Sequence, residues 1–205
     1  MSFSFFENFF LFLWSFFFSF FRLILLFLPR FTYKSKLQPQ NRVFSQKDIK
    51  EIQEKSFGKK RSFCFLLSSA GEYEQALPVI SFLSQDKEVF IILIFVSPSG
   101  YRYAQKRNES LPYYLSPFDI LREWKSLYEV LPLCKTIVVR YELWPCFLSI
   151  ASQKEGLYLL NASSLEKEIP WFPKVFRSYC YRFFDYIFLV DERSKKDFIL
   201  TYNLK

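Results

Sequence analysis

The feature that most constrains the fold is a regular alternation of short apolar runs with amphipathic segments after residue 61. The apolar runs occupy residues 62–67, 89–96, 113–115, 136–139, 157–160 and 186–190. Segments with helical periodicity lie at residues 73–83, 101–107, 120–130, 143–154 and 192–200. A repeated change from strand-like to helix-like periodicity is typical of serial βα units. The pattern therefore predicts an α/β fold, with a Rossmann-like, mostly parallel sheet flanked by helices.

The amino-terminal residues form a different kind of unit. Residues 9–28 read FFLFLWSFFFSFFRLILLFL, close to the ~20 apolar residues that cross a bilayer. Glu7 precedes this run and Pro29 follows it, which is unlike a cleaved signal peptide. We predict a membrane anchor helix over residues 1–29, a basic juxtamembrane connector over 30–61 and one domain over 62–205. Within the connector, Ser45 is expected to cap a short helix at residues 46–55.

The distribution of charge around the apolar run predicts the orientation of the anchor. Arg30, Lys34, Lys36 and Arg42 follow the run, whereas no Lys or Arg precedes it. The positive-inside rule therefore places the domain on the cytoplasmic side. Arg22 is costly inside a membrane span, so a helix that lies in the membrane interface is the alternative.

The overall charge and the cysteines narrow the class of function. The chain has 28 Lys and Arg against 20 Asp and Glu, which favours anionic partners such as phospholipid headgroups or phosphorylated glycolipids. The charge is spread out and partly juxtamembrane, so we predict no nucleic-acid partner. The four cysteines form no C-x-x-C pair and the chain has no His. We predict no metal site and four buried thiols.

Polar residues follow the predicted strands at the carboxyl edge of the sheet, where open parallel sheets bind ligands. The first loop contains Ser69, Gly71 and Glu72. Gly71 permits close backbone approach or a positive φ. Glu72 is either a general base for a sugar hydroxyl or simply a favourable residue in the first turn of a helix.

The later loops offer further candidates, each with a purely structural alternative. Ser97, Ser99 and Gly100 either bind an anion through hydroxyl and amide groups or form an ordinary turn. Arg140 and Glu142 directly follow residues 136–139, and Glu142 is either a site residue or a helix-start residue. Asn161 either forms a turn or orients a neighbouring carboxylate. Basic residues near the carboxyl terminus form either a membrane-facing surface or a solvated helix face: Lys174, Arg177 and Arg182.

Five segments in this order resemble the amino-terminal, acceptor-binding domain of the bacterial 3-deoxy-D-manno-octulosonic acid (Kdo) transferases of lipid A biosynthesis. The resemblance runs from about residue 63 to the end of the chain. It implies the amino-terminal half of a GT-B glycosyltransferase that is anchored in the inner membrane. Such an enzyme transfers Kdo from CMP-Kdo to a lipid A precursor, lipid IV(A), without a cofactor or a metal. The segments are SSAGEYEQALP (68–78), SPSG (97–100), YYLSPFD (113–119), YELWP (141–145) and NASSL (161–165).

The resemblance also implies roles for single residues. Glu72 matches the glutamate of the family's S-x-G-E segment, the proposed general base that activates an acceptor hydroxyl. Glu142 matches the second glutamate of the family's E-T-E-L-W-P segment, where it would help shape the site. The remaining candidates for shaping the acceptor site are Ser69, Gly71, Ser97, Ser99, Gly100, Arg140 and Asn161.

Several positions depart from the family's pattern. Leu66 stands where the family usually has His, Cys146 where it has Asn, and Ser163 where an Arg follows Asn-Ala. Arg140 and Tyr141 replace Glu-Thr, and the guanidinium reverses a local charge, so recognition of acceptor or donor is expected to differ.

The Gly-rich donor-binding segments of the family's second half are not found in this sequence. The expectation is therefore a truncated or split enzyme whose carboxyl-terminal donor domain is absent from the chain and comes from a separate polypeptide. The alternative is a non-catalytic, membrane-anchored acceptor-binding module or a decayed paralogue.

Overall fold

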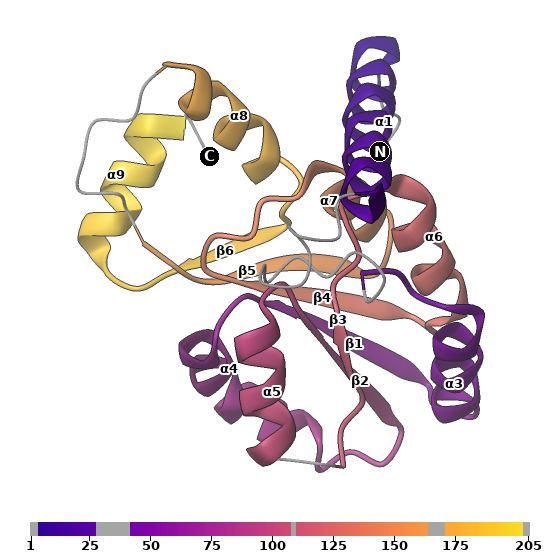
Figure 1. Cartoon of the computed structure of the whole chain (residues 1–205). Coiled ribbons are helices and arrows are strands. Elements are labelled where there is room, and N and C mark those ends of the chain that lie inside the picture. The colour runs from indigo at the N-terminus through magenta and orange to yellow at the C-terminus, as the bar shows by residue number, and fades with distance from the viewer. Residues whose placement is uncertain (1–3, 28–41, 108–109, 164–170, 203–205) are drawn as a thin grey trace.

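Six parallel strands form one sheet in the order β3-β2-β1-β4-β5-β6 (Figure 1). The computed structural model describes residues 4–27, 42–107, 110–163 and 171–202. This architecture confirms the predicted Rossmann-like α/β fold. The strands are β1 (Arg61–Leu67), β2 (Val89–Phe95), β3 (Tyr113–Leu115), β4 (Cys134–Val139), β5 (Gly156–Ala162) and β6 (Tyr186–Leu189). The helices are α1 (Phe5–Phe27), α3 (Gln46–Ser56), α4 (Ala70–Leu83), α5 (Pro98–Arg107), α6 (Leu121–Val130), α7 (Pro145–Ala151), α8 (Trp171–Tyr181) and α9 (Glu192–Tyr202).

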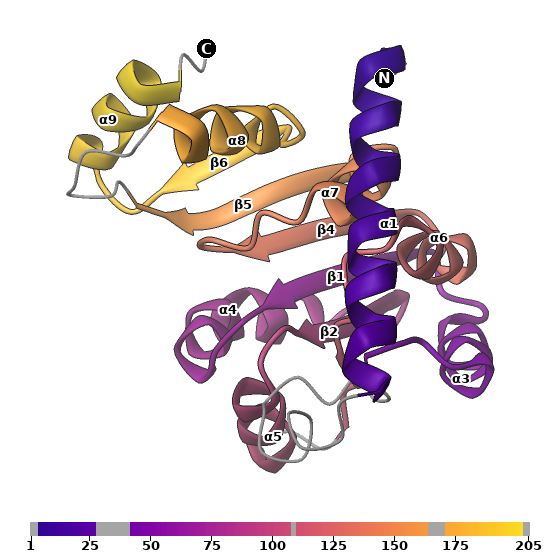
Figure 2. The ribbon, with the colours of Figure 1, turned by 45° about the horizontal axis from the view of Figure 1, so that its top comes forward.

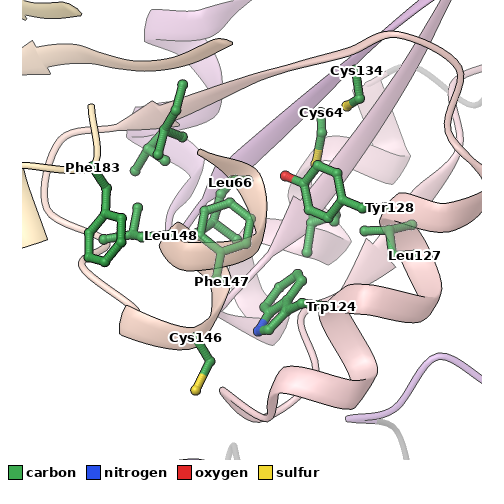
Figure 3. Packing of buried hydrophobic residues seen from close by; sticks show 14 of the residues in the cluster. Cys64, Leu66, Trp124, Leu127, Tyr128, Cys134, Cys146, Phe147, Leu148 and Phe183 are labelled. Carbon is green, nitrogen blue, oxygen red and sulfur yellow. The ribbon is translucent and has the colours of Figure 1, made fainter. Parts of the chain in front are cut away.

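Two apolar cores lie on opposite faces of the sheet. Helices α4 and α5 cover one face, where Tyr73 and Ala104 pack against the strands. The other described helices contribute to the core on the second face, in which Trp124 and Phe147 meet at 4.7 Å between ring centroids (Figure 3). Every residue of β2 is buried, as expected for a parallel strand covered on both sides.

The four cysteines are free and buried, which confirms the prediction. Burial raises the pKa of the Cys134 thiol to about 12 and that of Cys64 well above its ordinary value. These thiols are therefore protonated at neutral pH and pack as small apolar side chains.

Part of the predicted connector belongs to the packed domain. Helix α3 begins with a capping box between Ser45 and Asp48, which confirms the predicted short helix, and Ile52 is fully buried in the core. Arg42 is also buried, and its guanidinium donates to the Val96 carbonyl over 2.6 Å. Arg30, Lys34 and Lys36, on which the predicted orientation depends, lie outside the described residues.

Element boundaries differ from the predicted ones mainly around β4 and α7. The strand begins at Cys134, two residues earlier than predicted, because Cys134 pairs with Ser62 of β1. The helix predicted over 143–154 is the shorter α7, since Pro145 occupies its first turn and has no N–H to extend the helix backwards.

Among the described residues, one helix is long and apolar enough to cross a membrane: α1, over Phe5–Leu25. One side of it is docked on the domain, alongside α6 and α7 (Figure 2). Leu11 and Leu25 are 3% and 2% exposed, and Arg22 forms a 3.3 Å ion pair with Glu123. The opposite side exposes large apolar side chains, among them Phe5, Phe9, Phe12, Phe16, Phe20 and Leu23.

A buried carboxylate fastens α1 to the domain. Asp119 has no solvent exposure, and its carboxylate accepts four hydrogen bonds of 2.8–3.0 Å. The donors are the indole N–H groups of Trp14 and Trp124 and the backbone amides of Cys146 and Phe147. Asp119 therefore joins α1, α6 and the amino terminus of α7 at one point.

Candidate functional site

The candidate site lies where the order of the strands reverses, between β1 and β4. In open parallel sheets this switch point is where ligands bind, beyond the carboxyl ends of the strands. Leu66 pairs with Val138, and two residues further along each strand come Ser68 and Arg140. The loops after β1 and β4 therefore begin side by side at this edge.

Glu72 is 6% exposed and is held at the start of α4. Its carboxylate accepts two hydrogen bonds from Ser68, at 2.5 Å from the backbone N and at 2.7 Å from Oγ. Ser69 caps the same helix, because its Oγ accepts the Glu72 amide at 3.3 Å. The carboxylate is thus fixed by the residues that end β1 and begin α4.

Gly71 does not have the predicted backbone role. Its φ is not positive, and a Cβ at this position would meet only Ser69 Oγ, at 3.9 Å. Gly100 is the glycine that close packing requires instead. A Cβ there would lie 3.1 Å from a Phe95 ring carbon and 3.2 Å from the Ser68 carbonyl. Gly100 therefore brings the SPSG turn against the loop that carries Ser68.

The serines of the SPSG turn bond mainly to their own turn. Ser97 Oγ lies 2.6 Å from Ser99 Oγ and accepts the Gly100 amide at 3.3 Å. This arrangement caps the amino terminus of α5 and agrees with the structural alternative for these serines.

Glu142 lies close enough to Glu72 for the charge of Glu72 to affect it, and its own carboxylate is held by Trp144. Its Oε2 accepts the indole N–H of Trp144 at 2.5 Å. Burial raises the pKa of Glu142, and the charge of Glu72 acts in the same direction, while hydrogen bonds from Trp144 and Ser68 oppose the shift. The site therefore contains two neighbouring carboxyl groups, of which Glu142 holds a proton more readily than an ordinary glutamate.

Trp144 connects this carboxyl pair to α1. Its ring packs against Phe18 of α1, with 6.1 Å between centroids, while its N–H donates to Glu142. The candidate site is thus one side chain away from the helix that carries the exposed apolar surface.

Arg140 and Asn161 lie on the β5 side of the site. Both adopt left-handed backbone conformations, with φ of 68° and 56°. Asn161 Nδ2 donates to Gln75 Oε1 of α4 at 3.3 Å, and the hydroxyls of Tyr141 and Ser163 are hydrogen-bonded. These contacts draw the loops after β4 and β5 towards α4.

The structure thus brings together four of the predicted residues and adds Ser68 and Gln75, which the sequence did not single out. Glu72, Arg140, Glu142 and Asn161 gather at one edge, whereas Leu66, at the family's usual His position, is fully buried in the core. Ser68 and Gln75 were missed as site residues, whereas the sequence left Trp144 open as either a core residue or a site residue. Ser68 and Trp144 lie in the same SSAGE and YELWP segments as the glutamates that they contact, and this proximity in sequence was the available signal.

Cavity size does not locate the site. Hollows of about 660 Å³ and 930 Å³ lie next to the edge strands, the first beside β3 and α3 and the second between β6 and α9. Neither includes Glu72 or Glu142 among its lining residues. The site is located instead by the switch point between β1 and β4, where the two carboxyl groups lie.

The arrangement can support proton transfer next to an anion-binding group. A fixed carboxylate in a mostly buried position suits a general base, and a guanidinium nearby suits a phosphate or carboxylate. Within the described part of the chain, no group of three or more His, Cys, Asp or Glu side chains is placed to hold a metal ion.

Comparison with known proteins agrees with this arrangement. No curated protein matches the chain. A family model described as 3-deoxy-D-manno-octulosonic-acid transferase (kdotransferase) matches residues 39–202. This match spans most of the chain and includes all the strands of the sheet and both glutamates of the site. The chain belongs to the Kdo transferase family, of which it carries the amino-terminal domain.

Proposed function

We propose that this domain forms the acceptor side of an enzyme that transfers Kdo from CMP-Kdo to a lipid A precursor, lipid IV(A). Glu72 takes the proton of an acceptor hydroxyl, whose oxygen then forms a bond to the anomeric carbon of Kdo. The bond from that carbon to the CMP oxygen breaks, and CMP leaves with the electron pair. The observation that carries the proposal is a buried Glu72, fixed by Ser68 at the switch point of the sheet.

Glu142 supports this role through its environment. Burial and the charge of Glu72 raise the pKa of Glu142, so Glu142 holds a proton more readily than an ordinary glutamate. Neighbouring carboxyl groups can divide acid and base roles, and the proposal assigns the base role to Glu72 because Ser68 fixes its carboxylate.

The proposed acceptor is a lipid, which fits the position of α1. The domain is proposed to sit on the cytoplasmic side of the inner membrane, with the exposed Phe side of α1 in the apolar layer. The contacts of Trp14, Ser15 and Arg22 with the domain run along the opposite side of α1. A perpendicular span would carry Asp119 and Glu123 into hydrocarbon, which is costly. The packing therefore favours an α1 that lies along the membrane interface.

The donor, CMP-Kdo, is proposed to bind to a second domain that closes over this one, supplied by the same enzyme or by a separate polypeptide. No cofactor is invoked, because the nucleotide sugar itself provides the leaving group. GT-B architecture for the complete enzyme is part of this proposal.

Kdo transfer measured with a Glu72→Gln variant tests the proposal. In a strain that depends on this protein, and in its isolated membranes, Glu72→Gln should lower transfer about 100-fold or more, the usual contribution of a general base. Glu74→Gln is the matched control. Glu74 lies two residues further along α4, and its carboxylate contacts Tyr103 and Arg107 instead. Transfer that is equal in wild type and Glu72→Gln would remove the enzymatic role.

A second candidate is a non-catalytic, membrane-anchored module that binds the acceptor. Both bonds of the Glu72 carboxylate go to Ser68 at the start of a helix, which is also what a purely structural residue would do. Under this function, Glu72→Gln would leave Kdo incorporation unchanged and would lower only the unfolding temperature.

A further inference from the structure

Arg140 is distinct from the carboxyl pair beside it. Among the residues that the structure describes, no carboxylate lies within ion-pair distance of its guanidinium. Its Nε is buried and has no hydrogen-bond partner. Glu142, only two residues along the chain, bonds to Trp144 instead. A positive charge therefore stands at the site without a counter-charge in the described residues.

The fold holds Arg140 in this position by an unfavourable backbone conformation. Its φ of 68° is in the left-handed region, which disfavours side chains other than Gly and Asn. The Arg140 amide donates to the Leu160 carbonyl at 2.9 Å, and its guanidinium carbon lies 5.4 Å from the centre of the Tyr141 ring. Conformations of this kind persist where the surroundings impose them, and they are concentrated at ligand-binding sites.

We propose that Arg140 binds an anionic group of the substrate, a phosphate or a carboxylate, at the edge of the sheet where the loops after β1 and β4 begin side by side. The planar guanidinium offers parallel N–H donors that match either group in a two-point contact. An anion there satisfies the buried Nε and supplies the missing counter-charge. The Tyr141 ring under this guanidinium is itself held by a hydrogen bond between its hydroxyl and that of Ser163.

Two substrate groups share this chemistry. One is a phosphate of the acceptor glycolipid, and the other is the carboxylate of the transferred sugar acid. The inference rests on the proposed function for the choice of these two molecules, but binding is measured without transfer.

Three substitutions separate the charge of Arg140 from its backbone conformation. Arg140→Asn and Arg140→Gly remove the charge and tolerate a left-handed φ. Thermal unfolding midpoints equal to or above that of wild type are therefore expected for both. Arg140→Lys keeps the charge but loses the planar fork.

The test is calorimetric titration of the full-length chain in neutral detergent micelles with defined probes. The probes are the bisphosphorylated lipid A precursor, the same glycolipid without phosphates, and free Kdo. Because charge-assisted hydrogen bonds are strong, Arg140→Asn and Arg140→Gly should lower the affinity for one anionic probe about 10- to 100-fold. Arg140→Lys should recover part of this loss.

The pattern across the probes identifies the group. Weakened binding of the bisphosphorylated glycolipid, with the phosphate-free form unchanged, assigns Arg140 to a phosphate of the acceptor. Weakened binding of free Kdo assigns it to the sugar carboxylate. The inference would be overturned if Arg140→Asn, Arg140→Gly and wild type bound every probe with equal affinity. It would also be overturned if the two substitutions weakened binding of the phosphate-free glycolipid as much as binding of the bisphosphorylated one. A further outcome is that Kdo transfer is absent from the membranes while Arg140→Asn and Arg140→Gly still weaken binding of an anionic probe. In that case the proposed function fails and the inference about Arg140 stands.

Discussion

A double-mutant cycle between Trp14 and Asp119 would test whether α1 is docked on the domain when the protein is in a lipid-like environment. The indole N–H of Trp14 donates to Asp119 Oδ2 at 2.8 Å, and the carboxylate has no solvent exposure. The substitutions are Trp14→Phe, which removes the donor and keeps an aromatic ring, and Asp119→Ala. Alanine removes both carboxylate oxygens, so the bonds from Trp14 and from Trp124 are both lost in that variant.

The expected coupling follows from the charge and burial of the acceptor. A hydrogen bond to a charged group contributes about 1.5–3 kcal/mol, so the cycle should give a coupling free energy in this range. The free energy of unfolding would be measured by urea denaturation in neutral detergent micelles at pH 8, followed by far-ultraviolet circular dichroism. At this pH Asp119, whose pKa burial raises to about 6, is ionised.

Trp124 provides the matched control for this cycle. Its indole donates to the other oxygen of Asp119 at 3.0 Å from within the domain, so Trp124→Phe should couple to Asp119→Ala whether or not α1 is docked. A Trp14 coupling below about 0.5 kcal/mol, with the Trp124 coupling intact, would refute the docked arrangement. In that case α1 would be free to cross the membrane.

Three further predictions concern the carboxylate, the turn and the core. Because the native pKa of Asp119 is about 6 against an unfolded value near 3.9, the native state binds more protons between these values. The free energy of unfolding should therefore fall by about 2 kcal/mol as pH rises from 4 to 6, and the loss should be complete above about pH 7. Denaturation at several pH values should show this slope in wild type but not in Asp119→Asn. Gly100→Ala forces a Cβ to 3.2 Å from the Ser68 carbonyl. It should lower the free energy of unfolding by about 1–3 kcal/mol and should also reduce Kdo transfer. An unchanged melting temperature would contradict the close packing at Gly100. Phe147→Ala removes a fully buried ring and should cost about 3–5 kcal/mol, measured by urea denaturation, whereas a loss under 1 kcal/mol would contradict its place in the core.

The sheet could be predicted from the sequence because its strands are short apolar runs with buried neighbours on both faces. Residues 89–96 contain no charged side chain, and all of β2 is buried. The order of the strands was not predicted, because right-handed crossovers allow more than one order of parallel strands. Boundaries were less certain, as at Cys134, because pairing with β1 extends a strand beyond its apolar run.

The docking of α1 could not be predicted from its composition. A Phe side chain is equally suited to lipid and to a protein core, so hydropathy alone does not distinguish a span from a packed helix. The distinguishing contacts are polar and distant in sequence: Trp14 meets Asp119 and Arg22 meets Glu123 across more than 100 residues. Arg22, the charge that made a simple span costly, was the signal within the run.

The site was predictable as a set of loops but not as a set of contacts. Glu72 and Glu142 each follow a strand end, so topology alone brings them to one edge. Gly100 rather than Gly71 allows close packing, and Arg140 has no counter-charge among the described residues. Both facts depend on side-chain positions that a strand pattern does not contain.

The contact between Trp14 and Asp119 also has a consequence for the order of events during synthesis. These two residues are 105 positions apart, and a ribosome adds about 5–20 residues per second. Helix α1 therefore leaves the ribosome about 5–20 s before the surface on which it docks. During this interval the membrane is the apolar partner within reach, and α1 can bind it before the domain has folded. The sheet and its contact with α1 at Asp119 therefore form only after this helix has had time to bind an apolar surface.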